Sequence, residues 1–148
     1  GDEVGDDYTK VDQITDDVLA IFEAFEKFVG GVMSRDKLKA EIVKSNRYPD
    51  LEDEEVDQAV QNMKDNHLIL DEFDFDGKLV YVFDEKDLSD DQKDVIKTAL
   101  FAKKPMTADE FMKKLKWDKD KTTAALESLA EMSIATFEDK KYKFIGLQ

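Results

Sequence analysis

Apolar and polar positions in the C-terminal part of the chain change their period once, from helical to alternating. From residue 106 to 135 the apolar side chains recur at helical spacing, with Phe111 and Leu115 on one face of a short helix. A second helical stretch carries Ala125, Leu126, Leu129 and Met132. After it, apolar residues alternate with polar ones around a polar turn at 138–141 and end near Gly146. This pattern predicts two helices followed by a β-hairpin.

Capping signals place the starts of the helices in this part. Thr107 and Glu110 form the pattern T-x-x-E, in which a hydroxyl and a carboxylate satisfy free backbone amides at a helix start. The pattern S-x-x-Q at residues 89–92 predicts an earlier helix, ended by the Lys-Pro pair at 104–105. Asp118 is positioned to cap the helix that follows.

The N-terminal part predicts the same order of elements. A helix is expected to begin between Thr15 and Asp17 and to end at Gly30-Gly31. Its wide apolar face consists of Val18, Ile21, Phe22, Phe25 and Phe28. Ser34 can cap a second helix and residues 53–66 a third, and Asp-Gly at 76–77 predicts the turn of a hairpin.

The two parts can be aligned as a repeat. Met33, Leu38 and Ile42 match Met106, Phe111 and Leu115 at a shift of 73 residues, and three further apolar pairs match at a shift of 66. These three pairs are Val60 with Leu126, Met63 with Leu129, and Leu68 with Ile134. The shift changes once, within the loop at 45–53, as expected for a diverged structural repeat. Chance similarity between helical segments is the alternative.

The repeated order of elements predicts an α+β, mostly helical fold of tandem winged helix-turn-helix units, packed against each other as one body. Residues 1–13 would form a flexible acidic arm, residues 14–84 the first unit and residues 85–148 the second.

Charge is divided unevenly between these parts. Residues 1–84 carry 23 acidic and 9 basic side chains, whereas 13 of each follow, so the whole net charge of −14 falls in the first part. DNA-binding proteins neutralise phosphates with cationic side chains, and only two of the cationic residues here are arginines. Nucleic acid is therefore an improbable partner for the first unit.

Catalytic and metal-binding patterns are largely missing. The chain has no cysteine, and its single histidine, His67, has no partner ligands at zinc-site spacing. Residues 72–77 imitate the start of a calcium loop, but the twelfth position, which needs a glutamate, is Phe83. No phosphate-binding glycine loop is present. We predict no enzyme activity, no metal and no cofactor.

Two groups of side chains are candidates for binding a partner. The first is a tryptophan rimmed by lysines: Trp117 with Lys113, Lys114, Lys116, Lys119 and Lys121. The second is the acidic face of the third helix, with Glu54, Glu55 and Asp57, which would suit a basic partner. The alternative interpretation of the first group is an ordinary solvated helix end, with Trp117 packed on the core ahead of Asp118.

The caps, spacings and hairpins resemble tandem winged-helix subunits over residues 14 to 146. Such pairs occur in the ESCRT-II membrane-sorting complex, in kite subunits that bind kleisins, and in RNA polymerase III and archaeal transcription subunits. The motifs do not distinguish these families, and no functional residue is transferred from them. The resemblance implies a fold that several of these families use to bind protein.

We therefore predict a non-catalytic protein–protein interaction subunit or adaptor. A DNA-binding winged-helix transcription regulator that uses the second unit is the alternative, and an acidic decoy of a nucleic-acid-binding protein is a third possibility. No apolar run reaches the ~20 residues that cross a bilayer. The predicted location is cytoplasmic, although the chain does not begin with Met and a removed leader would leave no trace.

Overall fold

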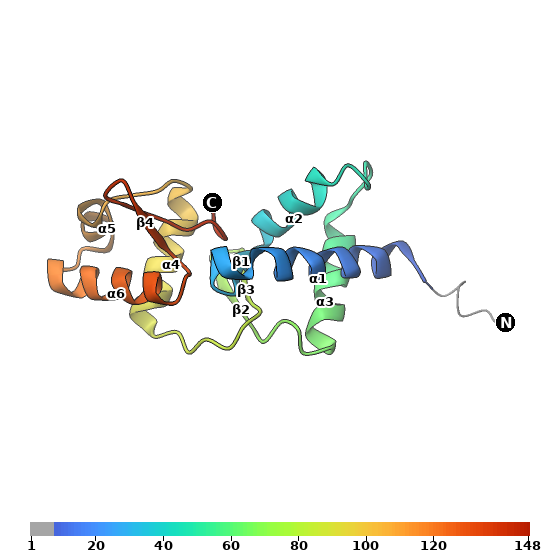
Figure 1. The fold of residues 1–148 in the computed structure, drawn as a ribbon, viewed down its shortest axis with the longest axis horizontal. Coiled ribbons are helices and arrows are strands. Elements are labelled where there is room, and N and C mark those ends of the chain that lie inside the picture. Colours follow the sequence, from blue (N-terminus) through green and yellow to red (C-terminus); the bar gives the residue numbers. More distant parts are fainter. Residues whose placement is uncertain (1–7) are drawn as a thin grey trace.

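Two groups of three helices lie at opposite ends of the molecule, with a three-stranded sheet between them (Figure 1). The structure is a computed structural model, and it describes residues 8–148. Residues 1–7, which belong to the predicted acidic arm, lie outside the described residues. The structure contains six helices and antiparallel strands in residues 8–148, and the order of three helices and a hairpin occurs twice. This confirms the predicted α+β fold class.

Each unit runs through three helices before its hairpin. The first unit consists of α1 (Lys10–Val29), β1 (Val32–Ser34), α2 (Arg35–Lys44), α3 (Asp53–Asp65), β2 (Asp71–Phe75) and β3 (Lys78–Val82). The second unit consists of α4 (Asp90–Ala102), α5 (Ala108–Leu115), α6 (Lys119–Glu131), β4 (Thr136–Glu138) and β5 (Lys141–Lys143).

Helix α1 begins earlier than the sequence patterns predicted. The predicted start was near Thr15, and the observed start is Lys10, with Thr9 as N-cap. The Thr9 hydroxyl accepts a hydrogen bond from the Asp12 amide, and the Asp12 carboxylate accepts one from the Thr9 amide. This capping box lies inside the region predicted to be a flexible arm, so residues 10–13 are helical instead.

The remaining caps are as predicted. Ser34, Ser89, Thr107 and Asp118 each accept a hydrogen bond from the amide three residues further on, and each begins a helix. Helix α1 ends at Gly30, which adopts the left-handed conformation with φ 60°. Phe28, predicted to lie on the apolar face of α1, is 58% exposed. At 100° per residue it lies about 80° from Val18 around the helix axis, beyond the edge of the buried stripe.

Strand β1 is an element that the sequence patterns did not predict. It pairs antiparallel with β3, which also pairs with β2, so the sheet order is β1-β3-β2. In the second unit Met106 makes a single bridge to Tyr142, where the first unit pairs Met33 with Tyr81. The two methionines are 73 residues apart and occupy the same place in the repeat.

Both faces of the three-stranded sheet are covered. Val32, Val80 and Val82 point to one face and belong to the hydrophobic cluster of the second unit. Met33 and Tyr81 point to the other face and belong to the cluster of the first unit. Because side chains alternate across a strand, the sheet serves as a layer shared by the two clusters. The two units therefore pack against each other through this sheet.

Close backbone contacts complete the junction between the units. The Ser34 amide donates to the Gly146 carbonyl over 2.8 Å, which ties β1 to the C-terminal segment. A side chain at Gly146 would place its Cβ 2.1 Å from the carbonyl oxygen of Val32. At Gly30, a Cβ would lie 2.4 Å from the carbonyl oxygen of Met132. Because only glycine permits these approaches, Gly30 and Gly146 allow the two units to pack this closely.

The repeat extends to special backbone conformations. Gly30 and Lys103, which end α1 and α4, have φ values of 60° and 58° and lie 73 residues apart. His67 and Ser133, which follow α3 and α6, have φ values of 58° and 63° and lie 66 residues apart. Both shifts are those that the sequence alignment used.

Candidate protein-interaction surfaces

Trp117 lies in the turn between α5 and α6. It is half-buried and packs against the hydrophobic cluster of the second unit, and the Lys121 ammonium lies 4.5 Å from the centre of its ring. Lys116 before it has φ 58°, and the Trp117 amide donates to the Met112 carbonyl over 3.3 Å. The aromatic ring is therefore fixed by the backbone turn and carries a cation on its exposed face.

The other lysines of this group surround the turn. Lys113, Lys114, Lys116 and Lys119 are exposed, and none has an ion pair within residues 8–148. Lys121 differs, because its ammonium also lies 3.7 Å from a carboxylate oxygen of Asp91. The Asp118 carboxylate accepts the Lys121 amide at the start of α6, so acidic groups are interspersed with the lysines. The structure brings all six predicted residues to one turn, and four of the lysines have no ion pair among the described residues.

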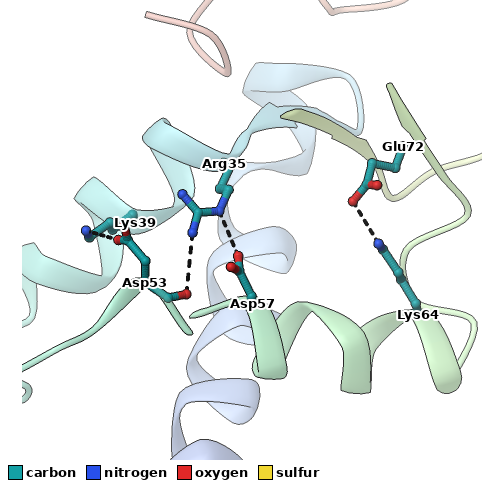
Figure 2. A network of polar contacts seen from close by, with 6 residues as sticks. All are labelled: Arg35, Lys39, Asp53, Asp57, Lys64 and Glu72. Atoms are coloured by element: carbon teal, nitrogen blue, oxygen red, sulfur yellow. Dashed lines mark hydrogen bonds and ion pairs between the residues drawn. The ribbon is translucent and has the colours of Figure 1, made fainter. Parts of the chain in front are cut away.

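Helix α3 is held on both sides by ion pairs. Figure 2 shows Arg35 and Lys39 of α2 reaching Asp57 and Asp53 of α3, and Lys64 of α3 reaching Glu72 of β2. The Arg35 Nε lies 2.7 Å from Asp57, and the Lys64 Nζ lies 2.7 Å from Glu72. These contacts connect α3 to α2 on one side and to the hairpin on the other.

The predicted acidic face is thus partly occupied within the molecule. Asp57 accepts from Arg35, and Glu55 accepts from the Glu52 amide over 2.9 Å and from Lys10. Glu54 is exposed and has no ion pair among the described residues. Of the three residues proposed from sequence, only Glu54 is wholly available to a partner.

These contacts also change acid–base behaviour. The hydrogen bond from Arg35 to Asp57 raises the pKa of the Arg35 guanidinium, and the Lys39 ammonium lowers the pKa of the Asp53 carboxyl. Backbone amide donation from Glu52, with Lys10, lowers the pKa of the Glu55 carboxyl. Each of these three shifts favours the charged form of its own group: Arg35, Asp53 and Glu55.

The segment that imitates a calcium loop has a structural role. Asp74 accepts the Gly77 amide over 2.7 Å and so closes the turn between β2 and β3, while Asp76 pairs with Lys97. Within residues 8–148 there is no group of three or more His, Asp or Glu side chains placed to hold a metal ion. In the same range no helix is long and apolar enough to cross a membrane.

An apolar groove between α1 and α3 is a surface that the sequence patterns did not indicate. We call it the α1–α3 groove, and its volume is about 170 Å³. Its apolar lining consists of Leu19, Phe22, Met63, Leu68 and Phe83. Phe22 and Phe83 stack at 4.0 Å between ring centres. Leu68 is 38% exposed at its rim, and Leu70 close by is 50% exposed. The spacing of apolar residues indicates which positions face the interior of a unit. It does not indicate which of these positions remain exposed after the other elements have packed.

Comparisons with known proteins support the class of fold. No protein-family model matches this sequence, and no match is found among curated proteins. The chain is similar in structure to a chain in the crystal structure of the endosomal complex ESCRT-II (VPS22/VPS25/VPS36), with a TM-score of 0.76 and 15% identity over 91% of this chain. A second similar chain, from the structure of the ESCRT-II endosomal trafficking complex, gives a TM-score of 0.73 and 15% identity over 90% of this chain.

These likenesses define a class first: the chain has a tandem winged-helix fold. Within that class, the predicted resemblance to ESCRT-II-like chains is confirmed at the level of the fold. This chain spans 63% and 62% of the length of the two chains it resembles, so less than two thirds of each is represented.

Proposed function

We propose that this chain is a non-catalytic protein-interaction subunit that joins partners through two winged-helix units. The observation that carries the proposal is the structural likeness to ESCRT-II chains over 91% of this chain. Those chains are components of the ESCRT-II complex. A cytoplasmic location, predicted from the sequence, accompanies the proposal.

The charges of the third helices support protein over nucleic acid as the partner. In a DNA-reading winged helix the third helix enters the major groove. Helix α3 begins with Asp53, Glu54 and Glu55, which would repel phosphates. Helix α6 carries Lys119 and Lys121 but also Asp120, Glu127 and Glu131. Neither helix presents a continuous cationic face.

Two surfaces of opposite character are available to protein partners in this proposal. The lysine-rimmed Trp117 would bind an acidic segment, because an aromatic ring bordered by cations combines apolar burial with charge attraction. The acidic first unit would bind a basic partner, with Glu54 as its free carboxylate on α3. An adaptor of this kind joins two partners of opposite charge.

The direct test is isolation of the intact chain from its native cell at low salt, followed by mass measurement of what remains bound. We expect a stoichiometric assembly larger than the single chain. Replacing Lys113 and Lys119 with Glu should release an acidic partner. Replacing Lys143 and Lys140 on the β4–β5 hairpin, which makes the same change in charge, should not. A chain that runs alone at every salt concentration would contradict the proposal.

A gel-shift experiment tests nucleic acid separately. Non-specific DNA sites are usually bound at micromolar protein when salt is low, about 50 mM. We expect no retardation of duplex DNA under these conditions. Retardation abolished by the Lys113 and Lys119 substitutions would instead favour the DNA-binding regulator.

A further inference from the structure

We propose that the α1–α3 groove of the first unit binds a basic segment of a partner protein, with an apolar side chain packed on Leu68 and a cation at the C-terminal end of α3. This inference rests on the proposed function and names one docking surface and the chemistry of its occupant. It follows from a comparison of the two units, from the charges around the groove, and from exposed leucines.

The same place in the second unit is covered. In the groove Phe22 and Met63 are buried, and Leu19, Leu68 and Phe83 are not. The corresponding residues of the second unit are all buried: Gln92, Val95, Leu129, Ile134 and Phe144. Ile134 is 2% exposed, whereas its counterpart Leu68 is 38% exposed. The covering group is the end of α1, because a Cβ at Gly30 would lie 2.7 Å from the Ile134 amide nitrogen. The fold thus already packs a chain turn on this part of one winged-helix unit.

A lysine from the connection before α4 lies at the end of α6. Lys86 donates from its Nζ to the Met132 carbonyl over 3.4 Å, at the C-terminal end of α6. The end of a helix carries partial negative charge on its unsatisfied carbonyls, so a lysine is favoured there. In the first unit the corresponding position is Asn66 at the end of α3, and both Asn66 and His67 after it are exposed. A basic residue from a partner would take the role that Lys86 takes in the second unit.

Charge around the groove favours a basic occupant. Glu23 and Glu26 of α1 line the groove itself, and neither forms an ion pair among the described residues. Beyond Leu70, further carboxylates without ion pairs in residues 8–148 border the adjoining hollows: Asp71, Glu85 and Asp87. The two lysines there are already paired, Lys64 with Glu72 at 2.7 Å and Lys86 with Asp84 at 3.7 Å. This surface therefore carries excess negative charge around exposed leucines.

Exposed leucines set the apolar part of the occupant. Ile69 is buried at 5% exposure, and Leu68 and Leu70 on either side of it face outward. In Figure 1 the segment from α3 to β2 runs from the lower end of α3 back to the central sheet, along the lower edge of the first unit. An occupant with two or three apolar side chains flanked by lysine or arginine would bury these leucines and neutralise the carboxylates. An acidic or uncharged segment would leave the carboxylates of the rim desolvated without partners.

The test uses a synthetic 14-residue peptide of lysine and leucine, with leucines at helical spacing, added to the intact chain. Amide chemical-shift mapping should place the peptide on α1, the end of α3 and residues 68–70. Leu68→Ser should weaken binding about tenfold or more, as expected for a central apolar contact. Val43→Ser, which changes another exposed aliphatic residue of the same unit, should leave the affinity unchanged.

Charge is tested by a second matched pair of variants. Glu23→Lys should weaken binding more strongly than Asp94→Lys, which makes the same change in net charge on α4, away from the groove. A lysine–serine peptide of equal charge should bind more weakly than the lysine–leucine peptide, and a glutamate–leucine peptide should not compete. Both variants lie on exposed helix surfaces, so they report on binding rather than on folding.

Several outcomes would overturn the inference. Equal loss of affinity in the Glu23 and Asp94 variants, with no effect of Leu68→Ser, would show attraction by overall charge alone. Shifts confined to the second unit would place the site elsewhere. A dimer of the chain that Leu68→Ser dissociates would identify a second copy as the occupant. A native assembly that forms normally with Leu68→Ser, while the peptide fails to bind, would reject the groove and leave the proposed function standing.

Discussion

Leu68 and Ile134 occupy equivalent positions in the two units, where the backbone has the same conformation, yet only Ile134 is buried. Each follows a residue in the left-handed conformation, and each donates its amide to the residue five positions earlier, Met63 or Leu129. Ile134 is 2% exposed and Leu68 is 38% exposed. The local structure is equivalent, so the difference comes from what packs against it. The first unit covers the second at this place, and no described element covers the first.

The same contrast appears between the second and third helices of the units. Ion pairs join α2 to α3 through Arg35 with Asp57 and Lys39 with Asp53. The corresponding positions in the second unit are Ala108 with Thr123 and Met112 with Lys119, and no ion pair joins α5 to α6 among the described residues. Ala108 packs against the hydrophobic cluster instead. The contact between the second and third helices thus includes ion pairs in the first unit and none, among the described residues, in the second.

Truncating the two equivalent side chains should give the largest difference. Ile134→Ala removes buried methyl groups and should lower the free energy of unfolding by about 2–5 kcal/mol. Leu68→Ala removes a partly exposed side chain and should cost about 1 kcal/mol or less. Urea unfolding followed by circular dichroism measures both. Equal costs would mean that the first unit does not cover Ile134 as the structure has it.

The sequence patterns predicted the order of helices and hairpins in both units. They did not predict the different burial of Leu68 and Ile134. Capping boxes at Ser89 and Thr107, the Asp-Gly turn and the shifts of 73 and 66 residues were all recovered, because local interactions determine them. Strand β1 was missed because it is short and its partner β3 lies far away in the sequence. The shared sheet was missed for a related reason. Its apolar run at 79–83 predicts a strand without telling which unit covers each face.

The candidate surfaces were predictable to different degrees. The lysines around Trp117 lie within nine residues, so the turn between two predicted helices brings them together. The partners of Glu55 and Asp57 were not predictable, because Lys10 and Arg35 reach them from other helices. The α1–α3 groove is formed by residues of α1 and α3 together with Leu68 and Phe83 from the connecting segments, and its exposure depends on the packing of the whole molecule.

Glycine-to-alanine substitutions should destabilise the chain more at the junction between the units than at an ordinary turn. Gly30 and Gly77 both have positive φ, 60° and 90°, but a Cβ at Gly30 would clash with Met132, and a Cβ at Gly77 would meet nothing within 4 Å. Gly77→Ala should cost about 1 kcal/mol, from backbone strain alone. Gly30→Ala adds overpacking against the second unit and should cost about 2–4 kcal/mol in all.

Thermal unfolding of the two glycine variants provides the measurement. The second unit should also become more accessible to limited proteolysis near residues 132–134 in the Gly30 variant, because the end of α1 that covers it is displaced. Equal melting temperatures for the two variants would contradict the close contact at Gly30.

The ion pair between α2 and α3 should have a smaller effect. Asp57 has a side chain that is 54% exposed, so water screens its attraction to Arg35. A double-mutant cycle of Arg35→Met and Asp57→Asn should give a coupling energy of about 0.2–1 kcal/mol, and high salt should reduce it. The same cycle on Ala108 and Thr123 has no charge to remove, so changes there should be insensitive to salt. A salt-independent coupling in the first unit would show that packing of Arg35, rather than charge, joins the two helices.

The smallest effect concerns the acid dependence of the first unit. Glu55 closes the capping box of α3, and the corresponding residue of α6 is Lys121, which cannot do so. The Glu52 amide and then Lys10 lower the pKa of Glu55 below its ordinary value of 4.5. Because the pKa is lower in the folded chain, the carboxylate stabilises the fold above the ordinary value, and this contribution is lost as the pH falls below it. Glu55→Gln should therefore destabilise the chain slightly near pH 7, and its difference from the unsubstituted chain should shrink toward pH 3. Urea unfolding at several pH values measures this difference. A difference that stays constant down to pH 3 would mean that Glu55 acts through its shape and hydrogen bonding alone, and that the charge asymmetry between α3 and α6 contributes nothing to stability.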